Sequence, residues 1–217
     1  MSRIRDIDIA TWPRAGQFAH FRAYAQPHFS ITAPLDVTRL VRRLKPDGVS
    51  VFNACVFALT EGGNAVPEFR TRFDGDRAYE HATVGASFTV PLQTGGFAFC
   101  EVARDGDFDR FDRACSQAID AARMQTGLTD TTKSQDGWLF MSCLPWLSFS
   151  AMTHAVRGPQ DCVPRIAWGR YQEDLDGRLV VPVSVQVHHA LVDGEHVAAF
   201  FANAQAALDA IRPGIIV

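Results

Sequence analysis

A valine-rich run near the C-terminus constrains the fold of this 217-residue chain more than any other segment. Every second residue from 179 to 187 is apolar, and the next position in this series is a histidine: Leu179, Val181, Val183, Val185, Val187 and His189. The positions between them carry Pro182, Ser184, Gln186 and His188. Because successive side chains of a strand point to opposite faces, this alternation predicts a β-strand with an apolar and a polar face. If the strand persists that far, His189 continues the apolar face and His188 the polar face.

Turn signals stand on both sides of this strand. Asp176-Gly177 precedes it and predicts a hairpin with the segment 165–172. Asp193-Gly194 follows it, and apolar residues then recur at helical spacing as far as Ile211. The C-terminal part is therefore expected to fold as strand, hairpin, strand and helix.

The rest of the chain mixes helices and strands in an irregular order. Capping residues and apolar spacing predict helices over 11–26, 36–44, 51–63 and from Asp107 onward. A hairpin is expected at Asp74-Gly75, with further strands over 83–90 and 96–102. This order predicts an α+β fold, or an α/β fold with a mixed sheet, and not a regular βαβ series. Without a linker or repeat, a single domain over residues 1–217 is the simplest interpretation.

Composition excludes several classes of function. A net charge of −3 gives no electrostatic reason to expect nucleic acid or an anionic membrane surface. No apolar run is long enough to span a bilayer, and the charged N-terminus is unlike a signal peptide, so a cytoplasmic protein is expected. The five cysteines are odd in number and widely spaced, which favours free thiols over a zinc site.

The three histidines of the C-terminal segment permit different interpretations. A histidine at the end of an apolar strand can act as a general base, because histidine in general titrates near neutral pH. The alternative, favoured on the residues alone, is a buried histidine that donates to a backbone carbonyl. His188 and His189 diverge on a strand and His196 is reached only through the turn, so a shared metal ion is not expected. Asp193 is explained equally well as the cap of the last helix.

Residues 188–194, H-H-A-L-V-D-G, form an H-H-x-x-x-D-G motif. It resembles the signature of the chloramphenicol acetyltransferases and of the wider superfamily of CoA-dependent acyltransferases. Two further segments resemble the same family: W-P-R-A-G-Q-F near the N-terminus and S-C-L-P-W-L-S-F around residue 145. The resemblance covers almost the whole chain in order. It implies a two-layer sandwich of helices on a mixed sheet, the fold of the CoA-dependent acyltransferases.

The resemblance also implies a mechanism and the residues that carry it. The family transfers the acetyl group of acetyl-CoA to a hydroxyl of chloramphenicol, which confers resistance to the antibiotic. By motif position His189 is the general base, with its other ring nitrogen bonded to its own backbone carbonyl. Ser142 would donate to the oxyanion of the tetrahedral intermediate. Asp193 would pair with Arg14 as a structural salt bridge that holds the catalytic loop.

Other positions carry over to binding. Arg170 and Tyr171 match the family's contacts with the CoA nucleotide, although an exposed cation and a packed ring on a hairpin would explain them equally well. Phe29 matches a phenylalanine of the family's acceptor pocket, whereas Phe21 stands where the family has a tyrosine that contacts the substrate. Trp146 is assigned to the same pocket and is expected in the core or in a channel wall. Ala167 stands near a family threonine, a departure that bears on the acceptor. The family is a homotrimer with its active sites between subunits, needs no metal, and binds neither nucleic acid nor membrane.

Two alternatives to chloramphenicol acetylation follow from these departures. One is an acyltransferase of the same mechanism that acts on a different small hydroxyl acceptor. The other is a non-catalytic protein of the same fold that binds a small molecule.

Overall fold

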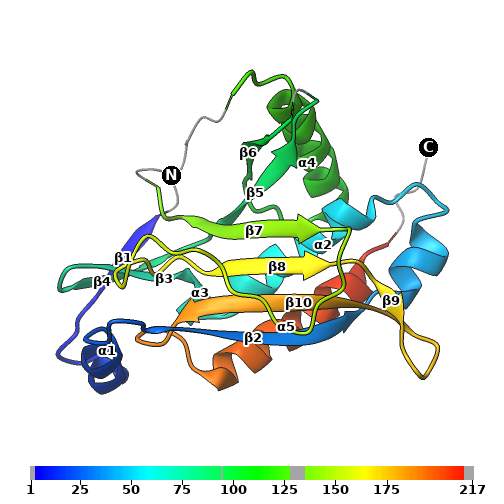
Figure 1. Ribbon diagram of the computed structural model, residues 1–217. Coiled ribbons are helices and arrows are strands. Elements are labelled where there is room, and N and C mark those ends of the chain that lie inside the picture. The colour runs from blue at the N-terminus through cyan, green and yellow to red at the C-terminus, as the bar shows by residue number, and fades with distance from the viewer. Residues whose placement is uncertain (1–2, 94, 128–134, 213–217) are drawn as a thin grey trace.

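A seven-stranded mixed sheet forms the centre of the protein in the computed structural model, which describes residues 3–93, 95–127 and 135–212 (Figure 1). The strand order is β2-β10-β8-β7-β5-β6, and the short β9 also pairs with β10. The strands are β2 (His28–Asp36), β5 (Gly85–Pro91), β6 (Phe97–Val102), β7 (Trp138–Leu144), β8 (Arg165–Gly169), β9 (Gln172–Glu173) and β10 (Leu179–His188). β7 runs parallel to both β5 and β8, and the other pairs are antiparallel.

A second, three-stranded sheet has the order β1-β4-β3. It consists of β1 (Ile4–Ile7), β3 (Thr71–Asp74) and β4 (Arg77–His81). The predicted hairpin at Asp74-Gly75 joins β3 to β4, and Gly75 adopts the positive φ of 54° that such a turn requires. The hairpin at Asp176-Gly177 is also confirmed, since β9 and β10 pair on either side of it.

Helices cover one face of the large sheet, where α2 packs on α5 and α4 packs beside β6 (Figure 1). The helices are α1 (Ala15–Phe21), the π-helical turn η1 (Leu40–Leu44), α2 (Val51–Asn64), α3 (Pro67–Arg70), α4 (Phe108–Arg123) and α5 (Gly194–Ala210). Ser50 and Asp107 cap α2 and α4 as predicted, each accepting from a backbone N–H three residues on. The predicted combination of helices and a mixed sheet is confirmed.

The first helix is shorter than predicted. Thr11 does not cap it, because its hydroxyl bonds back to Asp8 within a turn, and the helix begins after Pro13. The helix ends at Phe21, well before Gln26. Pro27 restricts Gln26 to extended backbone, so the helix could not have included that residue.

The polar face of β10 is not solvated, contrary to the simplest expectation for alternating residues. The segment between β7 and β8 crosses this face (Figure 1). Ser184 donates to the carbonyl of Met152, and Gln186 bonds both the N–H and the carbonyl of His154. Polar side chains on this strand therefore act as partners for an irregular segment that would otherwise bury unpaired backbone groups. The opposite face packs its valines against the helices.

In the described part of the chain, no helix is long and apolar enough to cross a membrane. All five cysteines are free thiols, as their spacing predicts. The single domain over residues 1–217 stays a prediction.

Candidate active site

His189 follows the last residue of β10, where its backbone N–H donates to the carbonyl of Pro27. Its imidazole is about a third exposed, with 36% of the side chain accessible. The ring of Phe21 stacks on it, with centroids 3.8 Å apart and planes at 10°. Phe29 packs against it at 4.8 Å in a tilted arrangement. Two residues predicted for the acceptor pocket thus enclose the ring of the predicted base.

The tautomer of His189 is set by a neighbouring carbonyl. Nδ1 lies 3.2 Å from the carbonyl oxygen of Val192, a distance at which an N–H donates. The partner differs from the expected one, the histidine's own carbonyl, because the turn at residues 190–192 brings Val192 back toward the ring. With the proton on Nδ1, Nε2 carries the lone pair and can accept a proton from a substrate.

Asp193 and Arg14 form a two-pronged ion pair beside His189. The guanidinium nitrogens lie 2.5 Å from Oδ2 and 3.0 Å from Oδ1 of the carboxylate. Hydrogen bonding to Arg14 is the main reason that the pKa of Asp193 is lowered. Oδ1 also lies 3.3 Å from Nδ1 of His189. The pair therefore ties the N-terminal segment to the turn after β10 and places a negative charge next to the imidazole.

The other two histidines of the motif region have structural contacts. His188 is 1% exposed, and its Nε2 lies 2.9 Å from the carbonyl oxygen of Pro159. Burial is the main reason that the pKa of His188 is lowered to about 4, so the ring is neutral at pH 7. Nδ1 of His196 accepts from the backbone N–H of Asp193 at the start of α5. These contacts account for both side chains without a reaction.

Among the described residues, one group of side chains lies close enough together to hold a metal ion: Asp193, Glu195 and His196. Both oxygens of Asp193 already accept from Arg14, and Nδ1 of His196 is occupied by a backbone N–H. The donor atoms are thus committed to the protein itself, and the cluster is explained by the start of α5.

Ser142 lies in the middle of β7, on the face covered by the segment between β7 and β8. It lines a cavity of about 340 Å³ between that segment and the strands. The lining residues are Ser87, Phe88, Thr89, Phe99, Phe140, Met141, Ser142, His154, Ala155, Val156, Arg157 and Arg165. Ser142 is therefore available to a ligand in this cavity.

Ser142 and His189 of one chain cannot meet. In the sheet register Ser142 pairs with Ala167 of β8, which pairs with Ser184 of β10. His189 lies five residues beyond Ser184, which corresponds to about 17 Å along the strand direction at ~3.4 Å per residue. Two strand spacings of ~4.8 Å separate them sideways as well. The predicted base and the predicted oxyanion donor thus stand at different places on the sheet.

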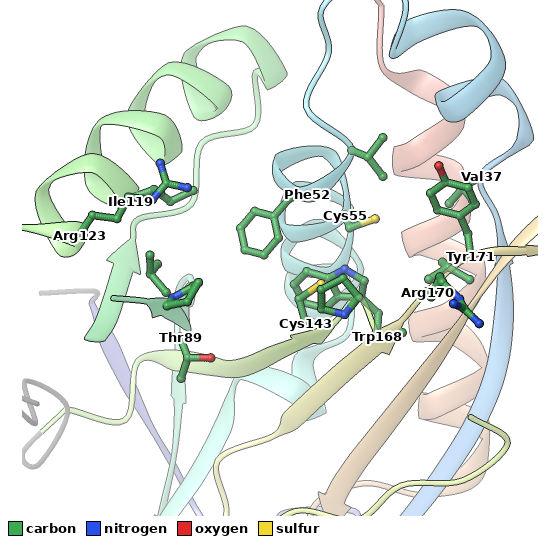
Figure 2. A pocket seen from close by; sticks show the side chains of 16 residues that line it. Val37, Phe52, Cys55, Thr89, Ile119, Arg123, Cys143, Trp168, Arg170 and Tyr171 are labelled. Carbon is green, nitrogen blue, oxygen red and sulfur yellow. The ribbon is translucent and has the colours of Figure 1, made fainter. Parts of the chain in front are cut away.

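A second cavity of about 430 Å³ lies between the helices and the C-terminal ends of β7 and β8 (Figure 2). Arg170 and Tyr171, the predicted CoA contacts, both line it. Figure 2 shows Arg123 of α4 at the opposite side of the cavity from Arg170, with Phe52 between them. Between the two cations the wall is mostly apolar.

The two cavities adjoin. Thr89 of β5 lines both of them. Ser142 and its neighbour Cys143 line one each, because adjacent side chains of a strand point to opposite faces. Thr89 thus belongs to both cavities, at the point where the pairing of β5 with β7 has ended after Phe88 and Met141. Sequence reasoning missed Thr89, since nothing distinguishes it locally from other strand threonines.

Trp146 is 71% exposed in the turn after β7, so it is not a core residue. Its place in a channel wall or in the acceptor pocket stays a prediction. Its neighbour Pro145 lines the larger cavity, and the backbone N–H of Arg170 donates to the carbonyl of Leu147 at 2.6 Å. The turn that carries Trp146 follows the end of β7, so this residue lies near Arg170.

Comparison with known proteins decides the family. The family model for chloramphenicol acetyltransferase matches residues 3–205. The chain belongs to the chloramphenicol acetyltransferase family. A chloramphenicol acetyltransferase of Streptomyces acrimycini is 33% identical over 196 residues, covering 88% of each chain. Chloramphenicol acetyltransferase 3 of Escherichia coli is 29% identical over 201 residues, covering 92% of this chain and 94% of the relative.

Solved structures agree with this assignment. A chloramphenicol acetyltransferase structure superposes with a TM-score of 0.86 at 27% identity, covering 95% of this chain and all of the other. The dihydrolipoamide acetyltransferase of Azotobacter vinelandii superposes with a TM-score of 0.62 at 18% identity, over 91% of this chain and 87% of the other, and shares the fold. The predicted family and the predicted CoA-dependent acyltransferase fold are confirmed, and membership makes the chain an acyltransferase by family.

Proposed function

We propose that the chain is an acetyl-CoA-dependent O-acetyltransferase that transfers the acetyl group to a hydroxyl of chloramphenicol. One observation carries the proposal beyond family membership. Nδ1 of His189 faces a carbonyl oxygen, which leaves Nε2 as the proton acceptor, and the ring is held by Phe21 and Phe29. A hydroxyl is a weak nucleophile at neutral pH, so the reaction needs an oriented base.

The reaction then proceeds without a covalent enzyme intermediate. Nε2 of His189 takes the proton of the acceptor hydroxyl as its oxygen attacks the thioester carbonyl of acetyl-CoA. The tetrahedral intermediate collapses when the C–S bond breaks. The departing thiolate of CoA takes the proton from the imidazolium, which returns His189 to its starting state. The nearby carboxylate of Asp193 stabilises the imidazolium while it exists.

Ser142 stabilises the oxyanion of the intermediate. Ser142 lines a cavity in the protein, where a hydrogen bond to developing negative charge is stronger than in bulk water. The larger cavity suits acetyl-CoA. Arg170 offers a phosphate a two-pronged hydrogen bond and Tyr171 offers the adenine a ring. The thioester would reach Ser142 where the two cavities adjoin at Thr89.

The active enzyme is a homotrimer with its active sites between subunits. The separation of Ser142 and His189 within one chain supports this, since both act on the same acetyl group. A neighbouring copy would supply the His189 that faces each Ser142 cavity. Phe21 and Phe29, which pack on His189, would then close the acceptor pocket from the neighbour's side.

A complementation experiment tests the shared site. His189→Ala and Ser142→Ala are each inactive or nearly so as pure homotrimers. When they are mixed by co-expression, a site is intact only if its histidine and its serine come from the two different variants. Random assembly then restores about a quarter of the wild-type activity, because each of the two requirements is met half the time. If every site lay within one chain, mixing would restore none.

The activity itself is tested by release of free thiol from acetyl-CoA. Release in the presence of chloramphenicol, absent in His189→Ala, is the expected result, and expression should raise the chloramphenicol concentration that a bacterium survives. If thiol is released with another hydroxyl compound but not with chloramphenicol, the acceptor is a different one. Binding without turnover of any acceptor would leave a small-molecule binder.

A different small hydroxyl acceptor is the second candidate function. Ala167 is fully buried and lies next to Ser142 in the register, near the position of a family threonine. A methyl group there cannot donate a hydrogen bond, so the polar contacts around the intermediate differ. Acetyl transfer by His189 and Ser142 should survive this change better than specificity for chloramphenicol does.

A further inference from the structure

His154 is the most unusual residue in the wall of the Ser142 cavity. It lines the cavity together with Ser87, Thr89 and Ser142. Within the described part of the chain, its Nε2 is buried and has no hydrogen-bond partner. An unpaired polar atom that solvent does not reach costs free energy. A turn of the ring toward the cavity would let a ligand pair with Nε2 and remove that cost.

The position of His154 is fixed by its backbone. Its N–H donates to Oε1 of Gln186 at 2.5 Å, and its carbonyl accepts from Nε2 of the same side chain at 3.2 Å. Gln186 is buried in the middle of β10, so the two bonds hold the residue against the sheet. The imidazole therefore projects from a rigid support, as a specificity contact requires.

The charge of the cavity limits what it can bind. Burial and the nearby Arg165 lower the pKa of His154 to about 4, so the ring is neutral at pH 7. Arg157 and Arg165 add two guanidinium groups, and Arg165 is paired with Asp161. Of the described residues that line the cavity, none carries a carboxylate. A cationic ligand would therefore find no acidic partner in this lining.

We propose that His154 is a specificity residue that hydrogen-bonds a second polar group of the acceptor, and that the acceptors are neutral or anionic hydroxyl compounds and not cations. The inference rests on the proposed function, since it assigns the acceptor to the Ser142 cavity. It adds the chemical class of the acceptor and the residue that selects it. His154 takes no part in the transfer of the acetyl group.

Two variants separate a specificity role from a structural one. His154→Leu removes the polar atoms at similar volume, and His154→Gln retains a group that can hydrogen-bond. We expect His154→Leu to raise the KM and the Kd for chloramphenicol about tenfold, the loss of one buried hydrogen bond of ~1.4 kcal/mol. The KM for acetyl-CoA should stay within about twofold, and His154→Gln should recover part of the affinity for chloramphenicol. Because an unpaired buried group is removed, the Tm of His154→Leu should rise or stay equal.

The readouts keep this inference apart from the proposed function. Calorimetric binding of chloramphenicol, of a neutral aromatic alcohol without a second polar group, and of a cationic aminoglycoside is measured with the wild type and both variants. The inference is supported if His154→Leu binds chloramphenicol more weakly than the wild type does and binds the other two compounds equally well. Absence of thiol release would contradict the proposed activity and would leave this binding result unaffected. Equal binding by all three proteins, preference for the aminoglycoside, no binding of any neutral compound, or a His154→Leu defect confined to assembly or Tm would overturn it.

Discussion

His189 and Ser142 are held in place by different parts of the fold. His189 follows the end of β10 and depends on side chains of the N-terminal segment, Arg14 through Asp193 and Phe21 through direct stacking. Ser142 lies inside the sheet, where its position follows from the register of β7 with β8. One site is therefore positioned by side-chain contacts between distant segments and the other by backbone pairing. The comparison teaches that the base can be displaced without disturbing the sheet, whereas the oxyanion donor cannot.

The largest expected effect is that of removing the base. His189→Ala should lower kcat about a thousandfold, because a positioned general base contributes roughly 10²–10⁴ to the rate. Steady-state release of thiol measures it. The fold and the binding of acetyl-CoA should be preserved, since the side chain lies at the end of a strand. A loss of less than tenfold would show that His189 is not the base.

Removal of the oxyanion donor should have the next largest effect. Ser142→Ala should lower kcat about a hundredfold, close to the ~3 kcal/mol that one such donor contributes, with little change in either KM. The matched control is Ser150→Ala, an exposed serine of the segment that follows β7. Equal activity of the two variants would remove Ser142 from the mechanism.

Loss of the Arg14–Asp193 pair should weaken both the positioning of the base and the stability of the fold. Arg14→Ala and Asp193→Asn should each lower kcat roughly tenfold and the free energy of unfolding by about 2 kcal/mol, as for a charge-assisted bond that is partly buried. The double variant should be no worse than either single variant, because both break the same pair. Additive losses would mean that the residues act separately.

The same pair predicts a direction for acid sensitivity. Because the folded pKa of Asp193 is depressed, its contribution is present above the unfolded pKa and is lost as the pH falls through the folded value. Activity and Tm followed into the acid range should show this loss, and Asp193→Asn should lack it.

The smallest effect is expected at His188, on the other side of the strand end. Its folded pKa of about 4 lies below the unfolded value near 6.5, so the unfolded state binds more protons between these limits. Stability should therefore fall as the pH is lowered from about 6.5 to about 4, and Tm should follow. His188→Gln should flatten this dependence without changing kcat at pH 7. An unchanged slope would show that His188 binds protons equally in the folded and unfolded states.

Local signals predicted much of the fold. The turns at Asp74-Gly75 and Asp176-Gly177, the caps Ser50 and Asp107 and the closing helix all appear where the sequence indicates them. These signals depend on a few adjacent residues, so they survive without knowledge of the rest of the chain. The first helix was predicted too long because Thr11 bonds to Asp8 instead of capping. A hydroxyl with two possible local partners cannot be assigned from spacing alone.

The site shows the same division. Strand parity and the motif both indicate His189, and the resemblance indicated the pairing of Arg14 with Asp193, whose geometry the structure supplies. Neither gave the Val192 carbonyl as the partner of Nδ1, the exposure of Trp146 or the unpaired Nε2 of His154. Each of these depends on how a turn or an irregular segment packs, which has no periodic signature in the sequence.

The sequence by itself determined the family, the strand with its alternating faces and the residues that the chemistry needs, because periodicity and motif spacing are properties of neighbouring residues. Only the tertiary structure decided which faces are buried, which cavities exist and how far apart Ser142 and His189 stand. These depend on the register between strands that are distant in the chain, and a shift of register would move each side chain to another neighbour. The register separates the two residues within one chain, and that separation supports an active site shared between chains.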